Sequence, residues 1–385
     1  MKRDNQYKYI SQSTRVESPL QRAGVIALEI IRLILAVVFI FSGFVKAIDP
    51  LGSTYKFEDY LTAFGGFFSD LTFIALPAAV ALSTFELILG LCFLLKVKLK
   101  TTSFLALLFM AVMLPLTLYV AVKNPVTDCG CFGDALIISN WETFYKNIII
   151  TAFVVILLIF HKKLRTIFMP AIEWILIVFF LLIGVGLSVH SQRNLPLINF
   201  RPYKIGVNIP EAMKVPEGKP TDKYDTKLIY QKDGINKEFT LENYPANDST
   251  WVFVEQKSTL VQKGFQPPIH NFYIVDENNN DITDELLRHH GNVNLLITYD
   301  VKKASKKGLE RAEKVYQRAK ANNEPFYALT ASTDEDIATV RAETGITFPF
   351  CKTDPVTLKT IIRANPGLMV INTGTIKEKR NWRDY

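Results

Sequence analysis

The chain has 385 residues, of which 49% are hydrophobic and 21% are charged, and its formal net charge is +7. Long apolar runs fill the part before His190 and mixed polar sequence follows it, which indicates a membrane part joined to a globular part. Much of the basic excess lies in short loops beside the apolar runs, as in membrane topology signals, so we expect no nucleic-acid partner. The sequence has no phosphate loop and no dinucleotide glycine fingerprint.

Five apolar segments are long enough to cross a bilayer, which takes about 20 residues of helix. Backbone polar groups inside lipid must be paired within their own segment, so all five are predicted to be helices. The first is expected to be an uncleaved span, because its apolar stretch and its polar leader are both long. The predicted spans cover residues 24–48, 71–95, 101–122, 141–160 and 171–190.

Lysines and arginines gather in residues 1–23 and in the second and fourth loops between the spans. The first and third loops carry only Lys56 and Lys123. Because basic loops stay in the cytoplasm, the sequence predicts a cytoplasmic N-terminus in the inner membrane. Five spans then place the second half of the chain in the periplasm, where we expect a protein partner in addition to the lipid bilayer.

Ionisable residues inside a span are costly and are usually paired or functional. Arg32 and Glu86 are both expected roughly 12–14 Å from the cytoplasmic ends of their spans, which predicts an ion pair between them. That pair either locks two helices or forms a polar site for a proton or a quinone head group. Glu29 lies one turn from Arg32 as a second partner. Ser42 and Lys46 lie near the outer end of the first span, where Lys46 is expected to snorkel outward.

The third loop contains two cysteines separated by one glycine, in a compartment where disulfides persist. A Cys-X-Cys disulfide closes a very small ring, which Gly130 tolerates best, and such a strained bridge is expected to be labile or catalytic. The alternative is a tight structural turn. No metal is predicted, because two cysteines cannot complete a zinc site. The loop residues of interest are Asp128, Cys129, Gly130, Cys131, Gly133 and Asp134; the two acids would raise the thiol pKa.

The first half resembles the DoxX/MauE-like family of membrane proteins over about residues 24–165. The resemblance rests on Arg32, Phe39, Ser42-Gly43-Phe44, Lys46, Asp49-Pro50, Glu86, Gly90, Asp128-Cys-Gly-Cys-Phe-Gly-Asp134, Trp141 and Lys146-Asn147. MauE-type members are implicated in maturing disulfide-rich periplasmic proteins during methylamine utilisation, and DoxX-type members in quinone-linked or thiol-stress complexes. The resemblance therefore implies that Cys129 and Cys131 are the redox pair and that a quinone is the cofactor to consider. A fifth span and a large extension depart from the family.

The second half is predicted to be an α/β domain with a β-rich lead-in. Residues 191–263 read as a linker and a β-hairpin, with strands at 227–230 and 238–241 around an Asp233-Gly234 turn. Strands are expected at 271–275, 293–299, 326–330 and 368–372, and helices at 306–322 and 334–343.

This strand and helix order resembles a thioredoxin-like domain of the TlpA or peroxiredoxin type, over residues 264–385. The resemblance implies a cis peptide bond at Pro366. Residues 300–307 contain no cysteine where that family carries Cys-X-X-Cys, so the domain is expected to bind a partner rather than to catalyse exchange. Cys351 is expected to be a buried or idle thiol.

Two functions remain open from the sequence. In the first, the protein is a redox accessory whose Cys-Gly-Cys loop exchanges disulfides with a periplasmic partner and passes electrons to a quinone. In the second, it is a non-catalytic scaffold or assembly factor whose thioredoxin-like domain binds that partner. A transporter is disfavoured, because no broken-helix repeat is present.

Overall fold

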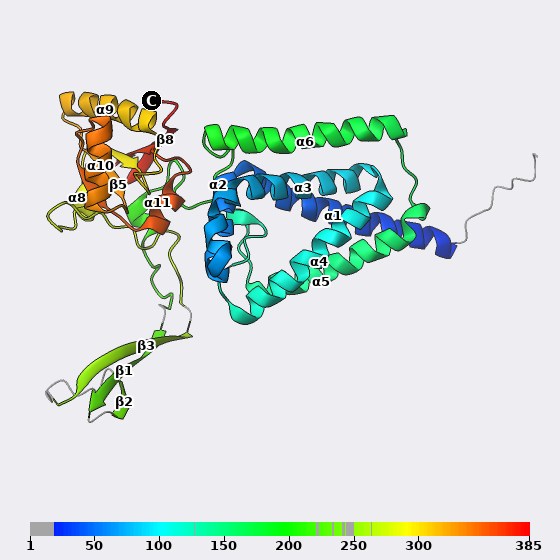
Figure 1. The fold of residues 1–385 in the computed structure, drawn as a ribbon, viewed down its shortest axis with the longest axis horizontal. Helices are drawn as coiled ribbons and strands as arrows, with labels where there is room; N and C mark the ends of the chain where they lie inside the picture. The colour runs from blue at the N-terminus through cyan, green and yellow to red at the C-terminus, as the bar shows by residue number, and fades with distance from the viewer. Residues whose placement is uncertain are drawn as a thin grey trace, which may run out of the picture. The chain divides into compact units, whose positions relative to one another are not determined.

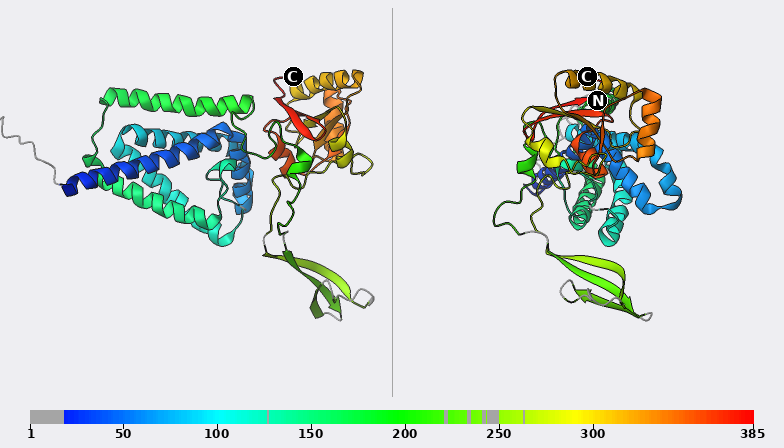
Figure 2. Two further views of the ribbon diagram at one scale, coloured as in Figure 1. Left: turned by 180° about the vertical axis from the view of Figure 1, so that it is seen from behind. Right: turned by 90° about the vertical axis from the view of Figure 1, so that its left-hand side faces the viewer.

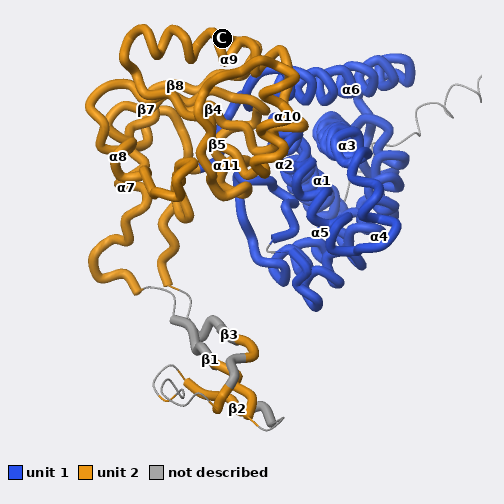
Figure 3. Tube along the Cα trace, turned by 60° about the vertical axis from the view of Figure 1, so that its left-hand side comes forward, with its two compact units in different colours: residues 1–201 blue, residues 202–385 orange. Residues whose placement is uncertain are grey.

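The computed structural model describes residues 19–126, 128–220, 223–232, 235–240, 243, 250–262 and 264–385. The chain forms two compact units, Met1–Arg201 and Pro202–Tyr385, which Figure 3 shows in different colours. The first unit is helical and the second is built on two sheets. Two units of different secondary structure agree with the composition change near His190.

Within the described residues, five helical segments are long and apolar enough to cross a membrane, which confirms the predicted spans. They run over Pro19–Ile48, Gly66–Leu95, Leu99–Lys123, Asn140–Lys163 and Pro170–Arg193. Their α-helical parts are α1 (Pro19–Ile48), α3 (Ala75–Leu95), α4 (Leu99–Lys123), α5 (Asn140–Phe160) and α6 (Pro170–Arg193). The first helix begins earlier than predicted, at Pro19 rather than at residue 24.

A shorter helix, α2 (Pro50–Phe64), lies across one end of the bundle, called here the α2 end (Figures 1 and 2). It follows α1 directly, because Asp49 caps its first turn by accepting from Gly52 N at 3.0 Å and Pro50 stands at its first position. A 3₁₀ segment, η1 (Gly66–Ile74), then leads into α3. The α2 end is where the Cys-Gly-Cys loop is held.

Helices α1 and α3 cross at unusually close range, and two glycines allow it. A Cβ added at Gly43 would lie 2.4 Å from Leu87 N, and one added at Gly90 would lie 2.4 Å from Ile40 N. Each glycine therefore faces the backbone of the other helix. This small-residue contact is a common way for membrane helices to approach.

The remaining helices close the bundle around this crossing. A continuous apolar core joins α1, α3, α4 and α5. Helix α6 packs on α3 where Gly184 meets the Thr84 side chain. The α5 helix begins with a capping box, in which Ser139 and Glu142 satisfy each other's backbone N–H groups. Fully buried members of the core include Leu35, Phe93, Met110 and Leu157.

The second unit contains a five-stranded mixed sheet in the order β6-β5-β4-β7-β8. Strands β4, β5 and β6 run parallel, and β7 and β8 are antiparallel additions. The strands are β4 (Asn292–Ile297), β5 (Phe326–Thr330), β6 (Phe350–Lys352), β7 (Gly367–Asn372) and β8 (Thr375–Asn381). The helices of this unit are α7 (Ile209–Ala212), α8 (Thr283–Arg288), α9 (Lys306–Ala321), α10 (Asp334–Thr344) and α11 (Pro355–Ile361).

The strands and helices predicted beyond residue 290 are confirmed as β4, β5, β7, α9 and α10, but one predicted strand is not. The strand expected at 271–275 is absent, and there Val275 forms only isolated bridges with Asp281 and Lys352. The short β6 and the turn-linked β8 had no clear sequence signal. Both are edge-side strands of the sheet, where pairing rather than propensity decides.

The region 191–263 is not one linker and hairpin unit as expected. Residues following Pro202 join the five-stranded sheet: Gly206 N donates to Ile376 O at 2.7 Å, and Ile376 N donates to Val207 O at 2.9 Å. Ile209 is fully buried there. The residues 203–209 therefore belong to the C-terminal fold, because β8 would otherwise present unpaired backbone groups.

The predicted hairpin is present as β1 (Lys223–Lys232) and β2 (Ile235–Thr240), and β3 (Val252–Gln262) extends it to an antiparallel sheet in the order β2-β1-β3. The Asp233-Gly234 turn lies outside the described residues. This small sheet interrupts the C-terminal unit between residue 220 and residue 264.

We expect Gly43→Ala to destabilise the bundle by about 1–3 kcal/mol, because its Cβ would meet the Leu87 backbone rather than a movable side chain. Thermal unfolding of the purified protein in detergent measures the change. Gly24→Ala in the same helix is the matched control, since nothing lies within 4 Å of its added Cβ. Equal melting temperatures for the two variants would contradict the close crossing.

Candidate functional site

The Cys-Gly-Cys loop is anchored to α2 by two contacts. Lys56 Nζ forms an ion pair with Asp128 Oδ2 at 2.7 Å, and Tyr60 Oη donates to Cys129 O at 3.1 Å. The other Asp128 oxygen accepts from Gly130 N at 2.9 Å. Gly130 has φ +67°, so its lack of a side chain is needed for this tight turn. Asp128 and Gly130 thus shape the loop.

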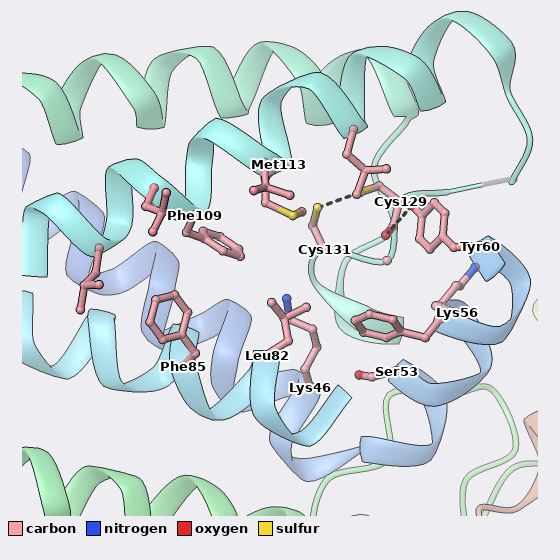
Figure 4. Close-up of a pocket in the computed structure, with 16 residues that line it drawn as sticks. Lys46, Ser53, Lys56, Tyr60, Leu82, Phe85, Phe109, Met113, Cys129 and Cys131 are labelled. Atoms are coloured by element: carbon pink, nitrogen blue, oxygen red, sulfur yellow. Dashed lines mark hydrogen bonds between the residues drawn. The ribbon is translucent and has the colours of Figure 1, made fainter. Parts of the chain in front are cut away.

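The two sulfur atoms of the loop face each other. Cys129 Sγ and Cys131 Sγ are 3.0 Å apart, which is a thiol–thiol contact rather than a bond, and Figure 4 shows both at one end of a cavity. A hydrogen bond from Cys129, together with the charges of Lys146 and Lys46, lowers the pKa of Cys131 to about 6. The same contact and burial raise the pKa of Cys129. The two thiols therefore differ in acidity: Cys131 loses its proton readily, and Cys129 retains its proton.

The loop acids do not act on the sulfurs as expected. The Asp128 charge is neutralised by Lys56, and cations rather than acids dominate around Cys131. Asp134 lies beyond the Gly133 turn in a short 3₁₀ segment, η2 (Gly133–Ala135), and lines a separate small cavity with Lys56. The expected rise in thiol pKa from these two acids is thus wrong for Cys131.

The partner of Glu86 is Lys46, not Arg32. Lys46 Nζ lies 2.6 Å from Glu86 Oε2 and 2.7 Å from Oε1, and both side chains are buried. Ser42 Oγ lies 2.7 Å from Glu86 Oε2 and 2.7 Å from Cys131 O. The prediction that Lys46 snorkels outward is therefore wrong, because α1 turns its Lys46 face towards α3.

Arg32 instead caps the far end of α3. Its Nε pairs with Glu29 at 2.7 Å, and its Nη1 donates to the carbonyl oxygens of Phe93 and Leu94 at 2.6 Å. These carbonyls are among those that a helix leaves unsatisfied at its C-terminus. Lys96 completes the group through its own ion pair with Glu29. Glu29 was correctly expected as a partner of Arg32, and this cluster accounts for Arg32 without Glu86.

A cavity of about 410 Å³ begins at the cysteine pair and runs into the apolar part of the bundle. Its far walls are apolar side chains of α3 and α4, such as Phe85 and Phe109 (Figure 4). Its polar end carries Lys46 as well as the sulfurs. Leu108 and Val112 line it and are also 58% and 64% exposed, so the cavity opens on the side of the bundle.

Two residues of this site, Lys56 and Tyr60, lacked a signal in the sequence, whereas Lys146 belongs to the set on which the family resemblance rests. Lys56 and Tyr60 belong to the short helix α2, and Lys146 lies on α5 with its Nζ 4.3 Å from the centre of the Phe132 ring. Lys56 and Tyr60 act across about seventy residues of chain, so no local pattern could identify them. Among the described residues, no cluster of His, Cys, Asp and Glu could hold a metal ion.

In the second unit, the Asn365–Pro366 peptide bond is cis, as expected at Pro366 from the resemblance described above. Ser305 N donates to Asn365 O at 3.0 Å, so the start of α9 lies beside this bond. The loop that leads into α9 carries Asp300 and Ser305 but no cysteine. Cys351 is buried in β6, and burial raises its pKa to about 12, which agrees with an idle thiol.

We expect Cys131 to react with iodoacetamide as pH rises through about 6, because its pKa is lowered and the thiolate is the reacting form. Mass spectrometry of the reduced, full-length protein in nanodiscs measures the rate at each cysteine. Lys146→Met should move the Cys131 profile to higher pH, and Lys123→Met should not. A Cys131 profile centred near the ordinary thiol value of about 8.5 would contradict this geometry.

Comparison with known families finds a match to a membrane-protein family within the helical unit. Residues 24–160 match the family model described as Methylamine utilisation protein MauE, and residues 224–263 match a domain of unknown function (DUF8463). No curated protein matches the chain. The first match spans α1 to α5 with the Cys-Gly-Cys loop, and neither match reaches the five-stranded sheet. The chain is thus a membrane protein whose residues 24–160 are similar to Methylamine utilisation protein MauE.

Proposed function

We propose that this protein is a membrane redox accessory that oxidises the thiols of a partner protein through Cys129 and Cys131 and passes the electrons to a quinone. The observation that carries the proposal is the position of the pair. Two sulfurs 3.0 Å apart stand at the polar end of an apolar cavity that opens on the side of the bundle. A dithiol in this place can exchange with a protein on one side and a lipid-soluble acceptor on the other.

The chemistry balances with these residues alone plus two reactants. In one half, the Cys129–Cys131 disulfide takes two electrons and two protons from a partner dithiol, which becomes a disulfide. In the other half, the reduced pair re-forms its disulfide and gives up two electrons and two protons, which a quinone held in the cavity would accept to become a hydroquinone. In the reduced pair, Cys131 is the thiolate and Cys129 is the protonated thiol. Cys129 keeps its proton until the pair is re-oxidised in the second half-reaction.

The site fits a quinone in shape and in charge. The walls formed by Leu82, Phe85 and Phe109 offer apolar and aromatic surface to a flat ring. Lys46 stands near the sulfurs, where quinone oxygens need donors. The side opening at Leu108 and Val112 suits a ligand with an apolar tail, because such ligands reside in the bilayer.

The side of the membrane on which the partner protein would meet the cysteine pair is inferred from the topology that the basic loops favour. The α2 end carries the third loop, which the distribution of lysine and arginine places in the periplasm of the inner membrane. Five spans put the second unit on that same side. The partner is then a periplasmic protein with thiols to be oxidised.

The second unit is proposed to be a thioredoxin-like domain that binds this partner. Three features support the assignment: the strand order β6-β5-β4-β7-β8, the helix α9 directly after the central strand β4, and a cis Pro366 beside the start of α9. Since the loop before α9 has no cysteine, the domain would present the partner without exchanging disulfides itself.

A non-catalytic scaffold is the competing function, and the absence of a cysteine before α9 is the feature that favours it. In that case the Cys-Gly-Cys loop is a tight turn held by Lys56 and Tyr60. The two functions differ in one observable, the cycling of the cysteine pair.

We expect the pair to be oxidised at rest in intact cells, reduced by a pulse of reductant, and re-oxidised within minutes. Acid quenching and alkylation trapping, followed by mass spectrometry, report the state of each cysteine. Cys92 and Cys351 are internal controls, since both are buried and far from a second sulfur. Thiols that stay in one state throughout the pulse would favour the scaffold.

Filling the cavity should block the quinone half-reaction alone. Met113→Trp places a large ring beside Cys131, so the purified, reduced protein should lose most of its ability to reduce a short-chain quinone, followed by absorbance. Alkylation of Cys131 should still occur. The matched control is Leu118→Trp on the same helix, which is exposed and does not line the cavity. Unchanged quinone reduction by Met113→Trp would exclude this cavity as the acceptor site.

A further inference from the structure

The group formed by Ser42, Lys46 and Glu86 presents a proton-counting problem. A serine hydroxyl carries one proton. Ser42 Oγ nevertheless lies 2.7 Å from two acceptors, the Glu86 carboxylate oxygen Oε2 and the Cys131 carbonyl oxygen. With an ionised Glu86, one of these two short contacts has no hydrogen between its oxygens. Both become hydrogen bonds only if Glu86 carries a proton, donates it to Ser42, and Ser42 donates to Cys131 O.

The charges around Glu86 permit such a protonated state. Lys46 faces it from α1, Lys146 faces the same space from α5, and Cys131 faces it from the loop. If the Cys131 thiol gives its proton to the Glu86 carboxylate, one anion replaces another and the total charge of the group is unchanged. Such a transfer avoids creating a new buried charge, which is the costly event in a site of low dielectric constant.

A path for the proton is also present. A second cavity, of about 30 Å³, is lined by Ser42, Glu86, Cys131, Lys146 and Asn147 among its polar residues. One water needs roughly 10–15 Å³ of such space and two to four polar partners. The cavity therefore satisfies both requirements for a water that joins the Cys131 sulfur to the Glu86 carboxylate.

We propose that Glu86 is the proton acceptor of the cysteine pair, taking the Cys131 proton through a water in this cavity when the thiolate forms. The reaction is thiol plus carboxylate giving thiolate plus carboxylic acid. The protonation of Glu86 then affects the loop through Ser42. Only while Glu86 is protonated can Ser42 accept from Glu86 and use its own hydrogen to donate to Cys131 O. Lys46 Nζ lies 2.6 Å from Glu86 Oε2 and 2.7 Å from Oε1, so it keeps its hydrogen bond to the unprotonated oxygen Oε1 in both states. The inference rests on the proposed redox function of the pair.

The test is an infrared difference spectrum between the oxidised and the reduced full-length protein in nanodiscs, with a phosphine reductant that adds no thiol of its own. Reduction should produce the S–H band of Cys129 together with the C=O band of a protonated carboxyl group. Glu86→Gln should remove the carboxyl band. Glu86→Asp should shift it, and Ser42→Ala should move it to higher frequency because a hydrogen-bond acceptor is lost.

Glu29→Gln is the matched control, since Glu29 is a carboxylate of the same bundle that also pairs with a lysine. It should leave the band unchanged. An S–H band without a carboxyl band would overturn the proposal, as would a carboxyl band that is unchanged in Glu86→Gln.

Failure of the redox function gives a different result, namely no S–H change on adding the reductant. The proton site is then tested by the spectral difference between acidic and neutral samples of the reduced protein. A Glu86 carboxyl band that shifts in Cys131→Ser supports the proton site, and a band that does not respond to this change overturns it.

Discussion

The close crossing of α1 and α3 is the contact on which the rest of the helical unit depends. Gly43 and Gly90 let each backbone approach the other to the distance at which a Cβ would clash. Ser42 and Lys46 stand one turn apart on α1, so the same crossing brings both of them onto Glu86 of α3. Ser42 in turn reaches the Cys131 carbonyl. A packing constraint between two helices thus fixes the electrostatic surroundings of the loop.

The bundle contains several ion pairs, and their positions distinguish those that stabilise helix ends from those that lie beside the cysteine pair. Arg32, Glu29 and Lys96 gather around the last carbonyls of α3, where they satisfy a helix end. Lys98 and Glu173 join the start of α4 to α6 in the same region. The Lys46–Glu86 pair, at the opposite end of α3, adjoins a sulfur and the cavities, as does the Lys56–Asp128 pair that holds the loop. The side chains of Lys46 and Glu86 are 7% and 3% exposed, whereas Glu29 and Lys98 are each 28% exposed, so the Lys46–Glu86 pair bears the greatest cost of burial as well as lying beside the reactive group.

The two units divide their roles in a consistent way if the proposed function holds. The helical unit contains the facing thiols and the apolar cavity, and the second unit contains a buried Cys351 and no cysteine before α9. Chemistry then resides in the membrane part, and the sheet domain contributes recognition. The small β2-β1-β3 sheet adds further surface to the second unit, since few of its described side chains are buried.

The sequence alone determined the features that depend on local composition. Apolar length defined five spans, the Cys-Gly-Cys string marked the loop, and alternation of strand and helix patterns located β4, β5, β7, α9 and α10. These succeed because span length, turn geometry and periodicity are properties of neighbouring residues. The tertiary structure alone decided which charges meet. The pairing of Arg32 with Glu86 was inferred from depth, but the register of the two helices is set by their crossing, where Gly43 meets Leu87 and Gly90 meets Ile40. In this register Arg32 lies beside the last carbonyls of α3, and Lys46 lies beside Glu86.

The same reason explains the other differences. Lys56 and Tyr60 reach the cysteine loop across about seventy residues of chain, and residues 203–209 pair with β8 across a still longer interval. Such contacts are selected by the unsatisfied charges and backbone groups that the folded chain presents, and no window of the sequence contains both partners. The residues of the candidate site could therefore be named in part from the sequence. The approach of Lys46 and Lys146 to Cys131, and the cavity beside that thiol, arise only when the helices have packed.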